Sequence, residues 1–157
     1  MNVTIRQGTE KDLPALLLLV RELAIFEKSP ESVENSIEKM TLEKDLFKFF
    51  LAESNGEAVG MVVYFFAYST WVGKTLYVDD LYVREAYRGQ KIGTSLLREI
   101  FQIAKSEDCG RLRWQVSDSN EGAKDFYKKK GAKITNKLLN CDFNKASIAQ
   151  FLTQTDS

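Results

Sequence analysis

Apolar residues recur along this chain with two different periods, and each period predicts a different kind of element. After Thr9, leucine and valine return every three to four residues, which is typical of a helix with one buried face. Thr9 is a favourable N-cap, and Asp12 occupies the acidic position of a weak capping box. The first helix is therefore expected to run from this cap to about Glu27, before Ser29-Pro30 ends it.

Runs rich in aromatic and β-branched residues predict strands. Asn55-Gly56 separates two of these runs and signals a tight hairpin turn. A second long helix is expected from Ile92, with Gly110 as its stop, and a shorter helix is expected between the caps Asn120 and Gly131. The expected strands are 3–6, 47–53, 57–68, 74–84, 111–116 and 135–143, and the remaining helical segments are 31–46 and 146–152.

The resulting order, β-α-α-β-β-β-α-β-α-β, predicts an α/β (α+β) fold with a mixed sheet and helices on its faces. No repeat, low-complexity segment or linker divides the 157 residues. Residues 1–157 are therefore expected to form a single domain with a full hydrophobic core.

Charge and composition narrow the classes of function. The 22 basic and 22 acidic residues cancel, so no basic field favours nucleic acid. The N-terminus lacks a signal-like apolar core, and no apolar run is long enough for a bilayer. Two cysteines make no disulfide framework, which favours a reducing cytoplasm. Histidine is absent, so Ser-His-Asp triads and most zinc sites are excluded, and acid–base chemistry falls to Asp, Glu, Tyr, Lys, water or substrate.

The segment 76–97 carries the candidate chemistry, because it joins an apolar strand, a glycine-containing loop and a helix start. Unpaired backbone N–H groups at a helix N-terminus favour an anion, and glycine lets the backbone approach a ligand. Asp79 and Asp80 lie on the strand, where adjacent residues face opposite sides unless a bulge intervenes. The segment predicts an enzyme that holds a phosphorylated cofactor beside acidic groups. The alternative is a surface turn with two ordinary surface carboxylates.

Arg88 to Gly93 resembles the acetyl-coenzyme A loop of the GNAT acetyltransferase superfamily, (Q/R)-x-x-G-x-(G/A), with Lys91 where the first motif glycine is expected. Three further segments are similar to spermidine/spermine and thialysine N-acetyltransferases: ELAIFE (22–27), YSTWVGKTLYVDDLYV (68–83) and NEGAKDFYKKKGA (120–132). They occur in the same order and at matching spacing. The resemblance implies the GNAT fold, with a mostly antiparallel sheet between helices on both faces.

The resemblance also implies acetyl-CoA as co-substrate, no metal, and a homodimer that shares residues across its interface. Asp79 stands where the family has a glutamate that helps to deprotonate the amine, and Tyr127 matches the general acid. Residues implied for the amine site are Phe26, Glu27, Trp71, Asp79 and Asp80. Residues implied to contact the cofactor are Leu81, Tyr82, Val83, Arg88, Gly89, Gln90, Lys91, Ile92, Gly93, Thr94 and Asn120.

The expected reaction is acetyl transfer to a primary amine of a small cation, either a polyamine or diamine or a lysine-like amino acid such as thialysine. Ser69-Thr70 stands where polyamine enzymes carry Asp-Pro, and segment 135–139 has Lys137 in place of acidic residues. Fewer carboxylates make a substrate with a single amine, or an amino acid, credible.

Several residues keep a second interpretation. Lys91 either adds positive charge for the phosphates or restricts the loop if a positive φ is required, and it is the best support for a non-catalytic acyl-CoA sensor. A protein N-acetyltransferase is a further alternative. From its position alone Tyr127 would be a core aromatic, and Glu22 is expected on a solvated helix face.

Overall fold

The computed structural model describes residues 2–154, and the chain forms two compact units that divide after Gln115. The strands are β1 (Val3–Gln7), β2 (Lys48–Ser54), β3 (Glu57–Ser69), β4 (Gly73–Val83) and β5 (Arg111–Trp114). The α-helices are α1 (Leu13–Phe26), α2 (Ile37–Leu42), α3 (Ile92–Ser106), α4 (Glu121–Lys129) and α5 (Lys145–Phe151), the last two in the second unit. Short 3-10 helices are η1 (Glu10–Asp12), η2 (Pro30–Ser32), η3 (Lys44–Leu46) and η4 (Glu85–Tyr87).

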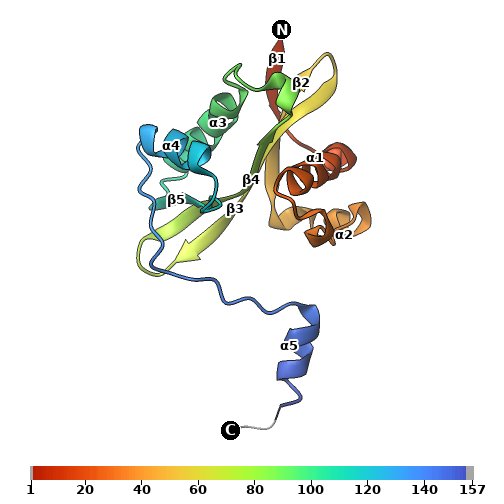
Figure 1. Cartoon of the computed structure of the whole chain (residues 1–157), viewed down its shortest axis with the longest axis vertical. Helices are drawn as coiled ribbons and strands as arrows, with labels where there is room; N and C mark the ends of the chain where they lie inside the picture. Colours follow the sequence, from red (N-terminus) through yellow and green to blue (C-terminus); the bar gives the residue numbers. More distant parts are fainter. Residues whose placement is uncertain (1, 155–157) are drawn as a thin grey trace. The chain divides into compact units, whose positions relative to one another are not determined.

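The first unit is built on a five-stranded sheet in the order β1-β2-β3-β4-β5. Neighbouring strands are antiparallel from β1 to β4, and β5 is parallel to β4. Helices α1 and α2 lie on one side of this sheet and α3 lies on the other (Figure 1). The prediction of a mixed, mostly antiparallel sheet with helices on both faces is therefore confirmed.

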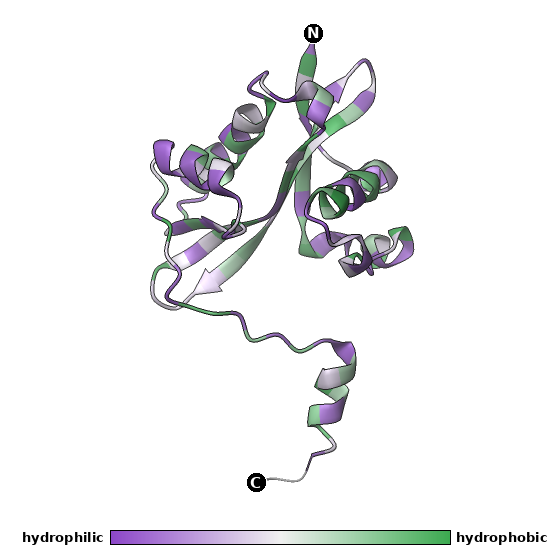
Figure 2. Ribbon diagram, viewed as in Figure 1, coloured by the Kyte–Doolittle hydropathy of each residue, from purple (hydrophilic) through white to green (hydrophobic). Residues whose placement is uncertain are grey.

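The central strands are buried on both faces, because successive side chains alternate between two cores. One core lies under α1 and α2 and includes Phe49, Leu51, Met61 and Val63. The other lies under α3 and includes Phe50, Ala52, Val62 and Tyr64. Hydrophobic colour runs along these strands, whereas the helices carry both colours, as expected for elements with one buried face (Figure 2).

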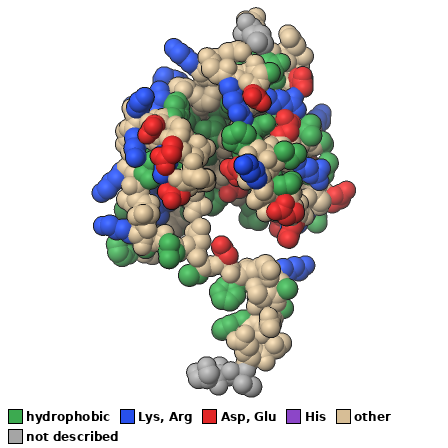
Figure 3. Space-filling view, viewed as in Figure 1, with side chains coloured by type: hydrophobic (Ala, Val, Ile, Leu, Met, Phe, Trp, Pro, Cys, Tyr) green, Lys and Arg blue, Asp and Glu red, His purple; other side chains and the backbone are tan. Residues whose placement is uncertain are grey.

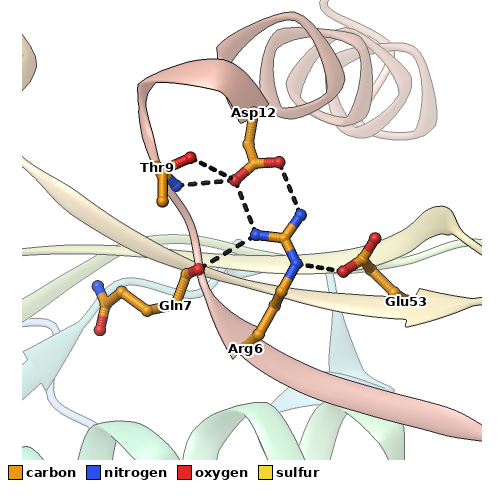
Figure 4. Close-up of polar contacts among 5 residues, drawn as sticks. All are labelled: Arg6, Gln7, Thr9, Asp12 and Glu53. Atoms are coloured by element: carbon orange, nitrogen blue, oxygen red, sulfur yellow. Dashed lines mark hydrogen bonds and ion pairs between the residues drawn. The ribbon is translucent and has the colours of Figure 1, made fainter.

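The start of the first helix is fixed by a network around Arg6 (Figure 4). The Asp12 carboxylate accepts the Thr9 backbone N–H at 2.8 Å and two guanidinium N–H groups of Arg6 at 2.8 and 2.7 Å. Arg6 also donates through Nε to Glu53 on β2. The Arg6 hydrogen bonds lower the pKa of Asp12 to about 2. The predicted cap at Thr9 is confirmed, and Arg6 ties it to the edge strand β1 and to the neighbouring strand β2.

Other local predictions are also confirmed. Asn55 and Gly56 have φ values of 53° and 78°, as a tight primed hairpin turn requires. The Asn120 side chain accepts the Ala123 N–H at 3.1 Å, and Gly131, with φ 99°, follows α4 as a left-handed cap. The predicted final helix is present as α5.

Gly110 is not the stop of α3, contrary to prediction. The helix ends at Ser106, and Asp108 is the left-handed residue after it, with φ 53°. Glycine is required at 110 for space, because a Cβ atom there would lie 1.9 Å from the Val72 carbonyl oxygen. The Gly110 N–H donates to the Lys74 carbonyl at 2.8 Å, so this close approach starts β5 beside β4.

Two segments have less regular structure than predicted. Among residues 2–154, no strand forms over 135–143. Its apolar residues Leu138 and Leu139 are adjacent and do not alternate, and they are 86% and 88% exposed. Segment 31–46 forms only the six-residue helix α2 between η2 and η3. Residues 2–154 contain no helix with both the length and the apolarity to cross a membrane.

Candidate active site

A bulge in β4 decides which way the two adjacent carboxylates point. Val78 pairs with Tyr64 and Asp80 pairs with Val63, so Asp79 is the extra residue on β4. Residues paired across neighbouring strands share a face of the sheet. Asp80 therefore faces the α1 side with Val63, although regular alternation after Val78 would have pointed it toward α3. The bulge that would let the two neighbouring carboxylates depart from strict alternation is therefore present.

Burial and negative charge act together on these carboxylates. Desolvation is the main reason that the pKa of Asp80 is raised to about 7, and the charges of Asp79 and Glu27 raise it further. Desolvation also raises the pKa of Asp79, which keeps contact with solvent. Glu27 directly follows α1, and because its charge and that of Asp79 both act on Asp80, these three predicted amine-site residues lie in one electrostatic environment.

Tyr77 belongs to the same surroundings, although the sequence did not single it out. Desolvation and the negative charge of Asp79 raise the pKa of its phenol. It lies two residues before Asp79 on β4, and its ring packs 5.1 Å from that of Phe65. A tyrosine is common in β-strands, so the sequence alone gives no sign that Tyr77 lies near Asp79 in this site.

Strand β4 extends past the end of its neighbour β5. β5 pairs with β4 only opposite Thr75–Val78, whereas β4 extends to Val83. No strand of residues 2–154 therefore lies beside the second edge of β4 at Leu81, Tyr82 and Val83. Their side chains pack into the two cores, and the backbone on this edge has no strand partner among residues 2–154, the arrangement in which an extended ligand can add as a further strand. The Val83 carbonyl accepts Arg88 Nε at 2.8 Å.

The loop between β4 and α3 uses two left-handed residues. Gly89 has φ 79°, and Lys91 has φ 63° and ψ 19° as the residue before α3. Lys91 thus adopts the conformation that the motif glycine would favour, at a cost of about 1 kcal/mol. The Lys91 side chain makes no capping hydrogen bond, because an ammonium group can donate but cannot accept a hydrogen bond. The first backbone N–H groups of α3 are therefore left for an anion.

The other predicted loop residues differ in what they can offer. The Ile92 side chain is buried in the α3 core, so only its backbone can meet a ligand. Gln90 is exposed and Thr94 is partly buried. A Cβ on Gly93 would meet only Val83 Cγ2 at 4.0 Å, so alanine also fits there. The loop therefore presents backbone more than side chains.

Arg88 joins the predicted cofactor loop to the predicted amine site. Its guanidinium lies 4.7 Å from the Phe26 ring centroid and 5.7 Å from that of Tyr82. Phe26 is the last residue of α1 and Tyr82 lies on β4. Trp71 is apart from this group, because it lies in the β3–β4 turn with 94% of its surface exposed.

Glu22 is not on a solvated helix face, so that prediction is wrong. It accepts Arg84 Nε at 3.0 Å and Arg84 Nη2 at 2.9 Å, and Arg84 Nη1 bonds Glu57. Sixty-two positions separate Arg84 from Glu22 in the chain. No local pattern marks such a pair, and sequence reasoning missed Arg84 entirely.

The remaining predicted residues lie on α4 in the second unit. Asn120 caps this helix through its side-chain oxygen, which leaves its amide N–H groups as donors. Tyr127 is near the other end of α4, with its ring centroid 5.5 Å from that of Phe126. Burial raises the pKa of Tyr127, so its hydroxyl keeps its proton near neutral pH.

Two further observations concern a cavity in the first unit and the possibility of a metal site. A cavity of about 460 Å³ lies between the β1–α1 connection and the η3–β2 connection, lined by residues such as Gln7, Glu10, Lys44 and Phe47. It contains none of the predicted site residues. Residues 2–154 hold no group of three acidic, histidine or cysteine side chains arranged for a metal ion.

Comparison with known proteins places these features in a family. Residues 14–132 match the model of the acetyltransferase (GNAT) family. Thialysine N-epsilon-acetyltransferase of Bos taurus is 37% identical over 142 residues, covering 83% of this chain and 84% of that protein. The human spermidine/spermine N(1)-acetyltransferase-like protein 1 is 32% identical over 139 residues, which cover 82% of this chain and 20% of that protein.

A solved structure shares the fold. An integron cassette protein from the mobile metagenome of V. cholerae superimposes with a TM-score of 0.80 and covers 98% of this chain and 99% of its own. Its sequence identity is 21%, so the likeness concerns the fold alone.

Proposed function

Because this chain belongs to the GNAT acetyltransferase family, in the branch of the diamine and thialysine acetyltransferases, we propose that it transfers an acetyl group from acetyl-CoA directly to a primary amine of a small cationic substrate. The observation that carries the proposal is the β4 bulge, which turns Asp80 to the α1 side, where the charges of Asp79 and Glu27 act on it. Negative groups at this position suit a cationic substrate.

Acetyl-CoA would supply the acetyl thioester that the amine attacks. The free edge of β4 suits the pantetheine arm, which the backbone of Leu81, Tyr82 and Val83 is proposed to bind. The loop residues Arg88 to Thr94, with the uncapped start of α3, are proposed to hold the pyrophosphate. Asn120 is proposed to contact the cofactor through its free amide donors.

The carboxylates of Asp79, Asp80 and Glu27 are proposed to bind the ammonium form of the substrate and to remove its proton, which is the main chemical obstacle to the reaction. An amine with a pKa of about 10.4 is almost fully protonated at neutral pH, and removing the proton across roughly three pKa units costs about 4 kcal/mol. A carboxylate attracts the cation but also stabilises its proton, so it must pass that proton on. We assign this step to Asp79 through water, with Asp80 and Glu27 holding the ammonium. The pKa of Asp80, about 7, makes Asp80 the second candidate for proton acceptor.

Tyr127 is the proposed proton donor to the departing thiolate. Because burial raises its pKa, the phenol is protonated at neutral pH and has a proton to give. The aromatic rings of Phe26 and Trp71 are proposed to line the amine site, where a ring face attracts a cation. The Phe26 ring already contacts one cation of the protein, because the Arg88 guanidinium lies 4.7 Å from its centroid.

The preferred substrate is proposed to be a lysine-like amino acid. Relatives in the comparison are named for thialysine, and this chain has Ser69-Thr70 and Lys137 where polyamine enzymes carry acidic or Asp-Pro residues. The test is an acetyl-CoA-dependent panel of thialysine, lysine, spermidine and spermine, with released thiol as the signal. A higher kcat/KM for thialysine or lysine is expected, and a strong preference for spermine would contradict this assignment.

Neither alternative gains support from a specific residue. The acyl-CoA sensor depended on Lys91, which has the left-handed backbone that a glycine would adopt and so preserves the loop. Protein acetylation depends on a peptide groove for which no described residue gives a sign. We therefore favour the small-amine enzyme.

We also propose that the protein is a homodimer. Leu138, Leu139, Phe143 and Leu152 are each more than 60% exposed, and hydrophobic side chains lie on the visible surface of α5 (Figure 3). Large apolar side chains that stay exposed in one segment suit a partner surface that would cover them. Light scattering on the purified protein is expected to give about twice the mass of 17.9 kDa, and a monomer at micromolar concentration would contradict the proposal.

A further inference from the structure

Arg84 connects three elements at the point where the loop leaves β4. Its backbone N–H donates to the Val59 carbonyl at 2.9 Å, which holds it to β3. Its guanidinium donates hydrogen bonds to Glu22 on α1 through Nε and Nη2, and to Glu57 at the start of β3 through Nη1. The Arg84 and Glu22 side chains are only 21% and 29% exposed, so this ion pair is shielded from solvent more than an ordinary surface pair.

The same helix receives a second contact from the loop. Arg88 lies over Phe26, and Phe26 is four residues after Glu22, hence on the same face of α1. Arg84 and Arg88 are likewise four residues apart, and they stand directly before and directly after η4. The loop is thus fastened to α1 on both sides of η4, immediately before the left-handed residues Gly89 and Lys91.

We propose that Arg84 is a positioning residue for the cofactor loop and that it acts through Glu22 on α1. This inference rests on the proposed function, because it assumes that the loop binds coenzyme A. Arg84 fixes where the loop begins, and a loop that presents backbone N–H groups binds an anion well only when those groups are held in place. Removing Glu22 leaves the guanidinium paired with Glu57 on β3 alone, and the start of the loop then loses its link to α1 through Arg84.

The chain supplies a matched control. Arg6 is also bound by two carboxylates from different elements, Asp12 and Glu53, but its network lies at β1 and β2, far along the chain from the cofactor loop. Glu22→Ala and Glu53→Ala therefore each remove one partner of a doubly paired arginine. The dissociation constant of coenzyme A is measured by titration calorimetry for both variants, beside their melting temperatures.

Glu22→Ala is expected to raise the dissociation constant about fivefold or more, while Glu53→Ala changes it less than about twofold at a similar loss of melting temperature. At saturating acetyl-CoA and amine, kcat of Glu22→Ala is expected to stay within about twofold of wild type, because Glu22 touches no reacting group. Should Glu22→Ala fail to fold, Glu22→Gln keeps one oxygen acceptor and is measured in its place.

Two other results would overturn the inference. If Glu22→Ala binds coenzyme A no more weakly than Glu53→Ala does, the loop does not depend on the contact between Arg84 and Glu22. If Arg84→Ala weakens binding while Glu22→Ala does not, Arg84 acts on the phosphates directly and not as a positioning residue. Failure of the wild-type protein to bind coenzyme A would instead remove the proposed function, so the two failures are distinguishable.

Discussion

Asp80 is paired with Val63 across the sheet, whereas Asp79, its neighbour in the chain, is the extra residue of the bulge and has no partner on β3. This offset turns Asp80 toward the α1 face, where the charge of Glu27 reaches it. Asp79 remains in contact with solvent. The two carboxylates therefore have different surroundings, and the difference suits a proton acceptor open to water beside a desolvated anchor for a cation.

The raised pKa of Asp80 predicts the pH dependence of amine use. Below pH 7 the carboxyl is mostly neutral and attracts an ammonium weakly, whereas above pH 7 it is anionic. We expect kcat/KM for the amine to rise through about pH 7. Asp80→Asn is expected to lower kcat/KM and remove that rise, and steady-state kinetics from pH 5.5 to 8.5 measure both effects. An identical rise in Asp80→Asn would show that another group titrates.

The same carboxyl is expected to cost stability. Its folded pKa lies above the unfolded value, so the folded state binds more protons and loses stability as pH rises from about 4 to about 7. With allowance for partial solvent screening, we expect Asp80→Asn to stabilise the protein by about 2 kcal/mol at pH 8 and by little at pH 4.5. Urea unfolding at the two pH values measures this, and an equal effect at both would disprove the cause.

Tyr127→Phe separates catalysis from binding. The change removes one hydroxyl and keeps the ring that packs on Phe126. If Tyr127 protonates the thiolate, kcat is expected to fall about 100-fold while the dissociation constant of coenzyme A changes less than about twofold. Asn120→Ala is the comparison, because it removes a helix cap and the proposed cofactor contact together. Full turnover in Tyr127→Phe would exclude Tyr127 as the acid.

Two glycines should respond in opposite ways to alanine. At Gly110 the new methyl group would overlap the Val72 carbonyl, so Gly110→Ala is expected to destabilise the protein by more than about 2 kcal/mol. At Gly93 the methyl group has room in the first turn of α3, and alanine is the better helix former. Chemical unfolding of both variants measures the difference. Equal losses would contradict the close approach of Val72 to Gly110.

Features set by neighbouring residues were predictable from the sequence. The Thr9–Asp12 cap and the Asn55-Gly56 turn depend on a few adjacent side chains and backbone angles, and both are present. The strand expected over 135–143 required a partner that sequence does not specify. A helix stop at Gly110 was inferred from glycine's backbone freedom, but the residue is needed for its small size.

Features that depend on distant residues were not predictable. The bulge at Asp79 follows from the register between β3 and β4, which no pattern in one strand defines. The Arg84–Glu22 pair joins positions that only folding brings together. Likewise, the sequence raised a positive φ at Lys91 as one possibility, and only the backbone resolves it.

The central claim is acetyl transfer from acetyl-CoA to a small amine. The most direct test incubates the protein with acetyl-CoA and thialysine and measures free thiol and acetylated amine, by a colorimetric reagent and by mass spectrometry. One acetylated amine is expected for each thiol released, with turnover well above that of Tyr127→Phe. Thiol release without an acetylated amine, or no release with any primary amine, would contradict the account.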